Sequence, residues 1–209
     1  MIRKERAKLI LDILKREYPY VKCTLNYTTP MEMLVATQLS AQCTDARVNI
    51  VTEELFKRYK SVEDFANADY DELCEYIRSA GFYRNKAKNI ISAARRIMEV
   101  YNGEVPDTME DLLSLAGTGR KTANLVLGDI FKKPAIVVDT HCIRLSGRMG
   151  LTNNTDPVKI EMDLTKIIPP EESLDFCHRL VNHGRLVCLA RKPKCDICAV
   201  RDVCMKKNV

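Results

Sequence analysis

Four cysteines lie close together near the C-terminal end of the sequence and restrict what this part of the chain can form. They follow the pattern Cys188-x6-Cys195-x2-Cys198-x5-Cys204. Four thiolates in one short loop can close around a metal centre, and cysteine-only ligation suits either zinc or a 4Fe-4S cluster. Structural zinc sites normally use two tight cysteine pairs, whereas only one pair is tight here. The spacing therefore favours a 4Fe-4S cluster over zinc, and over four thiols that are buried by coincidence.

The other five of the nine cysteines are scattered along the sequence. A single thiol within a helical pattern usually packs as a small apolar group. We therefore expect all five in the core: Cys23, Cys43, Cys74, Cys142 and Cys177. In a reducing compartment, the crowded set of four indicates a metal site and not disulfides.

Helix signals recur along the whole chain. Thr29-Pro30-Met31-Glu32 combines an N-cap, a proline at the first helical position and a capping-box acid, and similar starts follow at Thr44, Ser61 and Thr108. The first twenty residues interleave charges with leucine and isoleucine, which is typical of an amphipathic helix and not of a secretory signal. The only candidate strand, AIVV at 135–138, is too short and isolated for a sheet, so we expect a buried connector there. The sequence predicts an all-α protein.

The composition fits one or two compact domains, because 46% of the 209 residues are hydrophobic. No apolar run approaches the roughly 20 residues of a membrane span. Residues 185–209 hold seven of the 33 Lys and Arg and two of the 28 Asp and Glu, and this surplus of five equals the net charge of +5. Such a basic segment suits contact with phosphates, although a solvated tail is the alternative interpretation.

A glycine turn joins two predicted helices in the middle of the chain. Gly117-Thr118-Gly119 lies between a helix ending near Leu115 and one that we expect over 120–131. Backbone N–H groups beside a helix N-terminus make a site for a phosphate, so the segment indicates a helix-hairpin-helix motif. A tight turn without a ligand is the alternative. The basic pair that follows, Arg120-Lys121, favours the phosphate site.

Lys121 and Asp139 are candidates for chemistry. Lys121 lies in a first helical turn, where the helix dipole and Arg120 disfavour an ammonium, and a neutral amine is a nucleophile. A lysine that only contacts phosphate is the alternative. Asp139 precedes a helix predicted over 140–148; an N-cap role alone would explain it, but a capping carboxylate is also held rigidly enough for catalysis. His141 is interpreted as a structural residue.

Together, GTGRKTANLVL, VVDTH and the four-cysteine loop resemble the endonuclease III family of DNA glycosylases, within the helix-hairpin-helix superfamily. The resemblance extends from about Leu25 to Cys204. It implies two helical lobes flanking a DNA-binding cleft. A six-helix lobe would cover 22–133, and residues 1–21 with 134–209 would form the second lobe, which carries the 4Fe-4S cluster.

The resemblance also implies a reaction. Lys121 would attack C1′ of a damaged nucleotide, while Asp139 stabilises the positive sugar and assists proton transfer. The resulting Schiff base would undergo β-elimination and cut the strand 3′ to the abasic site. This is the activity of a bifunctional DNA N-glycosylase and AP lyase acting on oxidised pyrimidines. Monofunctional relatives lack a lysine at this position.

The same resemblance implies which residues contact DNA when a base is flipped out of the duplex. Gln42 matches the gap-filling glutamine of the family, and Asp45 matches the acidic residue of the same segment. Phe82 stands where the family often has leucine; it would be either an aromatic wedge or a core residue. Ala80 and Ala116 replace the commoner isoleucine and proline, which leaves the preferred lesion open.

Phosphate contacts would come from the hairpin and from the loop between the first two cluster cysteines. The residues are Gly117, Gly119, Arg120, Arg191, Lys192 and Lys194. The implied partner is double-stranded DNA with a damaged base or an abasic site. We expect a monomeric, cytoplasmic protein with no membrane partner, associated with the nucleoid in a prokaryote. The alternatives are a mismatch thymine or uracil glycosylase of the same fold, a non-catalytic DNA-binding iron-sulfur module, and an iron-sulfur electron carrier or sensor.

Overall fold

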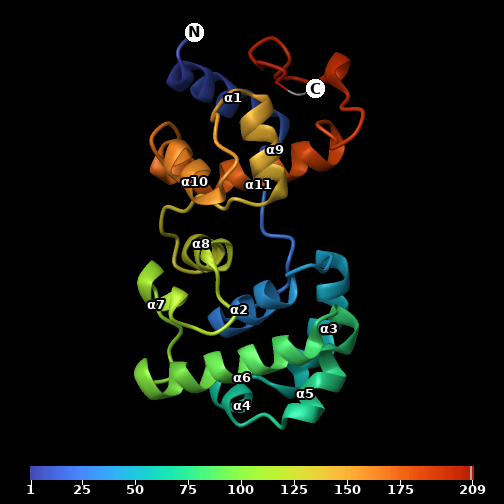
Figure 1. The fold of residues 1–209 in the computed structure, drawn as a ribbon, viewed down its shortest axis with the longest axis vertical. Coiled ribbons are helices and arrows are strands. Elements are labelled where there is room, and N and C mark those ends of the chain that lie inside the picture. Colours follow the sequence, from blue (N-terminus) through green and yellow to red (C-terminus); the bar gives the residue numbers. More distant parts are fainter. Residues whose placement is uncertain (208) are drawn as a thin grey trace. The chain divides into compact units, whose positions relative to one another are not determined.

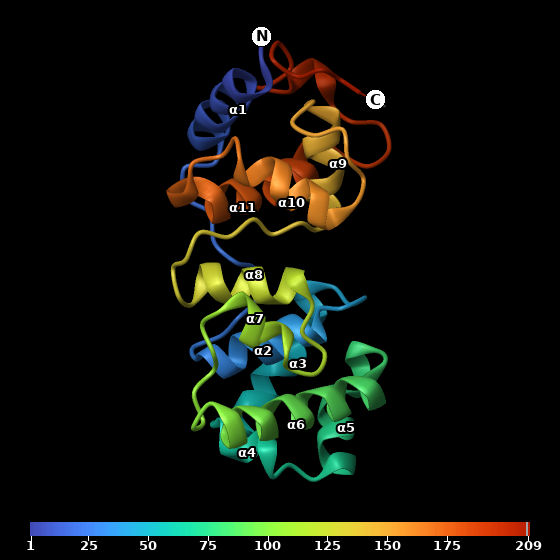
Figure 2. The ribbon, with the colours of Figure 1, turned by 60° about the vertical axis from the view of Figure 1, so that its left-hand side comes forward.

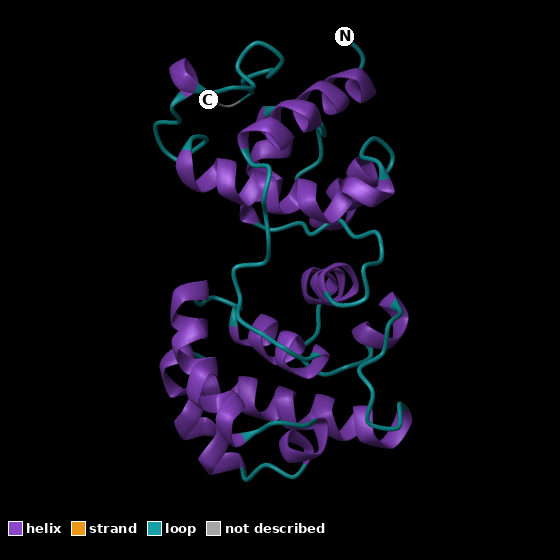
Figure 3. Cartoon of the chain, turned by 180° about the vertical axis from the view of Figure 1, so that it is seen from behind, coloured by secondary structure: helices purple, strands orange, loops and turns teal. Residues whose placement is uncertain are grey.

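The computed structural model describes residues 1–207 and residue 209. Every regular element within this range is helical, as Figure 3 shows, so the prediction of an all-α protein is confirmed. The α-helices are α1 (Arg3–Glu17), α2 (Pro30–Leu39), α3 (Asp45–Arg58), α4 (Val62–Ala66), α5 (Tyr70–Ile77), α6 (Tyr83–Val100), α7 (Met109–Leu113), α8 (Arg120–Asp129), α9 (Thr140–Arg148), α10 (Pro157–Thr165) and α11 (Ser173–Leu186). Three short 3-10 helices accompany them in the described part of the chain, η1 (Arg78–Ala80), η2 (Pro170–Glu172) and η3 (Cys195–Ile197).

The helix starts lie where the capping signals predicted them. The Thr29 hydroxyl accepts a hydrogen bond from the Glu32 N–H at 3.1 Å, and the Glu32 carboxylate accepts one in return from the Thr29 N–H at 3.3 Å. The Thr44, Ser61 and Thr108 side chains likewise accept a hydrogen bond from an N–H group in the first turn of α3, α4 and α7, and Ser61 also has the reciprocal bond. These bonds satisfy N–H groups that have no acceptor inside the helix, and each typically contributes about 1 kcal/mol.

The chain divides into two compact units, and the first is continuous in sequence, Cys23–Lys133. It holds seven α-helices, α2 to α8, one more than the six of the family pattern, and two of them, α4 and α7, are only five residues long. Nine of the ten residues of α2 are buried. In Figures 1 and 2, α2 lies between α6 and α8, and it contacts both. It is therefore the central helix of this unit.

The second unit combines both ends of the chain, Met1–Lys22 and Pro134–Val209. Its main helix is α11, which packs against α9 and α1. The segment before α9 has no regular structure, and its residues Ala135, Ile136 and Val137 are buried. The Ala135 and Val137 N–H groups donate to side chains of α11. The expected buried connector is therefore confirmed.

The prediction that five single cysteines are core residues is wrong for two of them. Cys74, Cys142 and Cys177 are buried in helices, whereas Cys23 and Cys43 are only half-buried. Both exceptions lie in irregular segments, before α2 and between α2 and α3. Among the described residues, no helix has the length and apolar character needed to cross a membrane.

Candidate functional site

The helix-hairpin-helix motif is formed by α7, a turn of six residues and α8. Gly117 has a φ of 74°, in the left-handed region that favours glycine. The turn is tied to α2, because the Gln38 side-chain amide donates to the Ala116 carbonyl at 2.9 Å and to the Thr118 hydroxyl at 3.3 Å. It also packs tightly on α6, since a Cβ at Gly117 would lie 2.8 Å from the Asn89 Cβ. The turn is therefore held by two neighbouring helices.

The end of this turn is open. Gly119 is the N-cap of α8, and a Cβ placed there would have no neighbour within 4 Å. The first N–H groups of a helix lack intrahelical acceptors and attract anions. Arg120 follows as the first residue of α8. The turn thus exposes backbone donors, and the half-buried Arg120 follows them directly.

Lys121 lies in the first turn of α8 and is exposed. The rest of the helix, from Thr122 to Asp129, is buried. Lys121 is therefore carried on a helix that is otherwise fixed in the protein interior. An exposed amine on a rigid support can act on a large substrate that stays outside the protein.

Asp139 is the N-cap of α9 and is half-buried. Its Oδ1 accepts a hydrogen bond from the Cys142 N–H at 2.7 Å, so the capping role is confirmed. The preceding connector is bonded to α11, as described above, so the backbone that leads to Asp139 is held as well. His141 contacts Arg144, with 3.2 Å between the His141 Nδ1 and an Arg144 guanidinium nitrogen. This is consistent with a structural role for His141.

Gln42 and Phe82 are exposed and have unusual backbone conformations. Their φ angles are 55° and 48°, in the left-handed region that non-glycine residues rarely adopt. The Phe82 side chain is 64% exposed, so its interpretation as a core residue is wrong. Asp45, at the start of α3, differs from these two because its Oδ2 accepts a hydrogen bond from the Thr24 hydroxyl at 2.5 Å. Gln42 and Phe82 thus remain available for contact with a partner.

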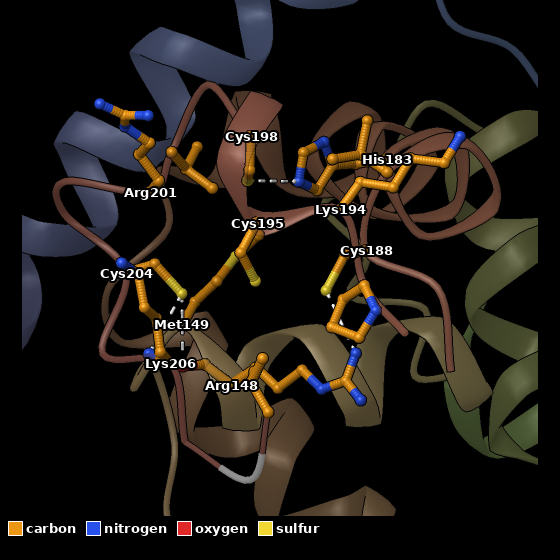
Figure 4. A pocket seen from close by; sticks show the side chains of 14 residues that line it. Arg148, Met149, His183, Cys188, Lys194, Cys195, Cys198, Arg201, Cys204 and Lys206 are labelled. Atoms are coloured by element: carbon orange, nitrogen blue, oxygen red, sulfur yellow. Dashed lines mark hydrogen bonds between the residues drawn. The ribbon is translucent and has the colours of Figure 1, made fainter. Parts of the chain in front are cut away.

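The four clustered cysteines line one pocket, shown in Figure 4. They are Cys188, Cys195, Cys198 and Cys204, and all four are half-buried. Burial raises the pKa of Cys198 and Cys204, and repulsion from the other cysteines of the loop raises it further. Iron binds cysteines as thiolates, and its positive charge would offset this repulsion.

The donor set fits a 4Fe-4S cluster. In the described part of the chain, no group of three or more His, Cys, Asp or Glu side chains could hold a single metal ion. The four thiols instead line the wall of a shared pocket, and four cysteine ligands are the usual set for such a cluster. The residues present are therefore suited to an iron-sulfur cluster.

Two side chains outside the cysteine pattern support this pocket. His183 is buried, and its Nε2 lies 3.4 Å from the Cys198 Sγ, while its Nδ1 lies 3.0 Å from the Tyr18 hydroxyl. Burial lowers the pKa of His183 to about 4. Arg148 donates to the Leu189 carbonyl at 2.7 Å and lies 3.5 Å from the Cys188 Sγ.

Arg191, Lys192 and Lys194 are exposed on the loop between the first two cysteines. The loop is closed by the Lys194 N–H, which donates to the Val187 carbonyl at 3.0 Å. Arg148 fixes it further through the Ala190 carbonyl at 3.0 Å. The three cations are thus presented on a fixed loop.

Sequence reasoning missed three residues that organise these sites, namely Lys86, Arg148 and His183. One signal was available for Lys86. It precedes Ile90 by four residues and Ala94 by eight, so it stands on the apolar stripe of α6, where a lysine needs an explanation. The capping and motif signals do not reveal such tertiary contacts.

Comparison with known proteins gives two family matches. Residues 35–170 match the HhH-GPD superfamily of base excision DNA repair proteins, and residues 188–204 match the iron-sulfur binding domain of endonuclease III. The first match covers more than half of the chain and includes the hairpin and both candidate catalytic residues. The second spans the four-cysteine loop.

The chain is similar over nearly its whole length to an endonuclease III of Synechocystis, with 53% identity across 97% of this chain and 93% of the relative. A solved structure of a trapped covalent intermediate between endonuclease III and DNA matches with a TM-score of 0.93 and 42% identity, covering 99% of this chain and 97% of that one. A thermostable thymine-DNA glycosylase matches with a TM-score of 0.85 at 24% identity, over 96% of this chain and 95% of that chain. The last match supports the shared fold alone.

Proposed function

The chain belongs to the endonuclease III family within the HhH-GPD superfamily of base-excision DNA repair proteins, and from this membership we propose how its own residues carry out the reaction. The protein is a DNA glycosylase and AP lyase with a 4Fe-4S cluster. We propose that it removes oxidised pyrimidines from duplex DNA. We further propose that it cuts the strand 3′ to the resulting abasic site.

The placement of Lys121 is the observation that supports this proposal best. The amine is exposed in the first turn of α8, directly after the turn that ends at Gly119. One similar solved structure is a trapped covalent intermediate with DNA. A lysine amine can form such a bond with a sugar carbon, whereas an activated water would leave no covalent link to the protein. We therefore assign the nucleophile to Lys121.

In the proposed mechanism, the Lys121 Nζ attacks C1′ while the bond from C1′ to the base breaks, and the base leaves with a proton. The sugar ring opens, and Nζ and C1′ form a Schiff base. A proton then leaves C2′ and the C3′–O bond breaks, which releases the downstream strand with a 5′-phosphate. Hydrolysis of the imine returns the amine.

Asp139 acts by charge in this proposal. Loss of a base from a sugar passes through an oxocarbenium-like state, which a fixed carboxylate stabilises. The Asp139 side chain is fixed by its bond to the Cys142 N–H. Asparagine caps helices about as well as aspartate, so Asp139→Asn removes the charge and keeps the cap. Base excision by this variant should fall severely while its stability changes little.

The remaining residues bind DNA or the cluster. We propose that Gln42 and Phe82 fill the space left by the flipped nucleotide, and that Asp45 supports the Gln42 segment. The hairpin and the basic loop bind phosphates through Gly117, Gly119, Arg120, Arg191, Lys192 and Lys194. Cys188, Cys195, Cys198 and Cys204 would hold the cluster, which would fix the shape of the basic loop. We propose a monomer that acts in the cytoplasm, on the nucleoid of a prokaryote.

The test uses duplexes that carry thymine glycol, dihydrouracil, oxidised guanine, a thymine–guanine mismatch or an abasic site. We expect excision and strand cleavage at the two oxidised pyrimidines and cleavage at the abasic site. Excision of mismatched thymine without cleavage would instead support a mismatch glycosylase. Binding without any product would support a non-catalytic module.

Two lysine variants distinguish loss of the catalytic amine from loss of one positive charge. Lys121→Gln should abolish strand cleavage and leave DNA binding measurable. Lys88→Gln, which removes an exposed charge on α6, should cleave like the wild type. Strand cleavage retained by Lys121→Gln would overturn the proposed mechanism.

A further inference from the structure

A single buried lysine joins two segments that are distant in sequence. Lys86 is 6% exposed, and its ammonium donates to the carbonyls of Leu39 at 2.8 Å, Ala41 at 2.8 Å and Ala80 at 2.9 Å. An ammonium has three N–H groups, and here each of them can meet a carbonyl. All three bonds can form only when the two segments lie at one particular distance from each other.

Each segment leads directly to an exposed residue with a left-handed backbone. Ala41 precedes Gln42, whose φ is 55°, and Ala80 lies two residues before Phe82, whose φ is 48°. Such conformations are strained for a non-glycine residue and persist only where the surroundings enforce them. The bonds from Lys86 hold the backbone just before both residues.

The burial of the Lys86 charge has a cost, which its three hydrogen bonds to backbone carbonyls offset. The residue lies on the apolar stripe of α6, and burial lowers the pKa of Lys86, which reflects the cost of placing a charge there. An apolar side chain would fill the same stripe without that cost, but it could not bond to the three carbonyls. The lysine is explained if the two segments must keep a fixed spacing.

We infer that Lys86 is a positioning residue that holds Gln42 and Phe82 as a coupled pair, preset to enter the duplex when a base is flipped out. This inference rests on the proposed function, because it uses the gap-filling roles of Gln42 and Phe82. Without the lysine, both side chains would remain present but would have to be ordered during each flipping event. The rates of steps that need base flipping should then fall more than the rates of steps that do not.

The test compares Lys86→Met with Lys88→Met, which removes an exposed lysine two residues further along the same helix. Two reactions are measured under single-turnover conditions: excision of thymine glycol from a duplex, and cleavage at an abasic site in single-stranded DNA. A 2-aminopurine base next to the lesion reports unstacking. For Lys86→Met we expect excision about tenfold slower or more, with a smaller fluorescence change, and cleavage of single-stranded abasic DNA near the wild-type rate. Lys88→Met should match the wild type in all three.

A double-mutant cycle tests the coupling. If Lys86 acts through the two exposed residues, Lys86→Met should cost little more in a protein that already carries Gln42→Ala and Phe82→Ala. Full additivity would overturn the inference. So would an equal loss of both reactions, or wild-type excision by Lys86→Met.

Two further comparisons keep the outcome decisive. If Lys86→Met does not fold, as judged by circular dichroism and iron content, Lys86→Gln is tested by the same readouts, because it keeps donors without the charge. A wild-type protein that excises no base would overturn the proposed function itself. A normal wild type with an unaffected Lys86 variant would overturn only the positioning role.

Discussion

Gly117 offers a quantitative test of the hairpin, because Gly119 provides a matched control in the same turn. In Gly117→Ala, the new Cβ would lie 2.8 Å from the Asn89 Cβ, which is close to the α6 backbone and cannot easily move. The backbone would also keep a φ of 74°. Gly119 has an ordinary φ of −96° and open space where an added methyl group would lie. The two substitutions therefore differ in strain and not in chemistry.

The expected magnitudes follow from these contacts. A left-handed alanine costs about 1–2 kcal/mol and overpacking about 1–3 kcal/mol. Alanine also lowers the conformational entropy of the unfolded chain, which offsets roughly 0.4–1 kcal/mol of this destabilisation. We expect Gly117→Ala to lower the free energy of unfolding by about 2–4 kcal/mol, and Gly119→Ala by less than about 1 kcal/mol, from the poorer N-cap.

Urea denaturation followed by circular dichroism measures the two changes in the free energy of unfolding. Binding to a duplex with an abasic-site analogue, measured in parallel, should weaken in both variants. In Gly117→Ala the turn is displaced, whereas in Gly119→Ala the methyl group occupies the space in which a phosphate would approach the backbone. Equal destabilisation of the two variants, or a Gly117→Ala protein as stable as the wild type, would refute the reasoning.

Other predictions concern the cluster and the basic loop. Cys198→Ser should lower the iron and acid-labile sulfide content of the purified protein, while Cys74→Ala, at a buried cysteine of α5, should keep both; iron loss in the second variant alone would contradict the ligand assignment. The combined change Arg191→Gln and Lys192→Gln should weaken DNA binding and reduce the slope of log affinity against log salt by about 2, because each phosphate contact contributes about 0.9. Lys57→Gln, on α3, should leave that slope unchanged. A double variant with the same slope as Lys57→Gln would contradict a phosphate-binding loop.

Local signals were sufficient to predict much of the fold. Helix caps such as Thr29 and Thr108 act within three residues, so their side-chain bonds can be inferred from the sequence and are confirmed in the structure. The start of the helix over 140–148 was predictable for the same reason, since Asp139 caps it. The connector before it was recognised by its apolar composition and its short length.

Features that depend on tertiary contact were not predictable in this way. The role of Lys86 requires that the carbonyls of Ala41 and Ala80 meet at one place, and no local pattern encodes that meeting. The burial of Cys23 was overestimated because its segment lacks a helical face. The exposure of Phe82 could not be decided from the sequence, since the glycine before it permits both arrangements. Lys121 and Asp139 are candidates because of their positions at helix starts, whereas their steps in the reaction follow from the family resemblance and stay proposals.

Borohydride trapping with peptide mapping tests the assignment of the nucleophile most directly. The enzyme is incubated with an abasic duplex and borohydride, the covalent product is digested, and the modified residue is identified by mass spectrometry. We predict a single reduced adduct on Lys121 and no trapping of Lys121→Gln. An adduct on another lysine or on the N-terminal amine, or undiminished trapping of the variant, would contradict the account.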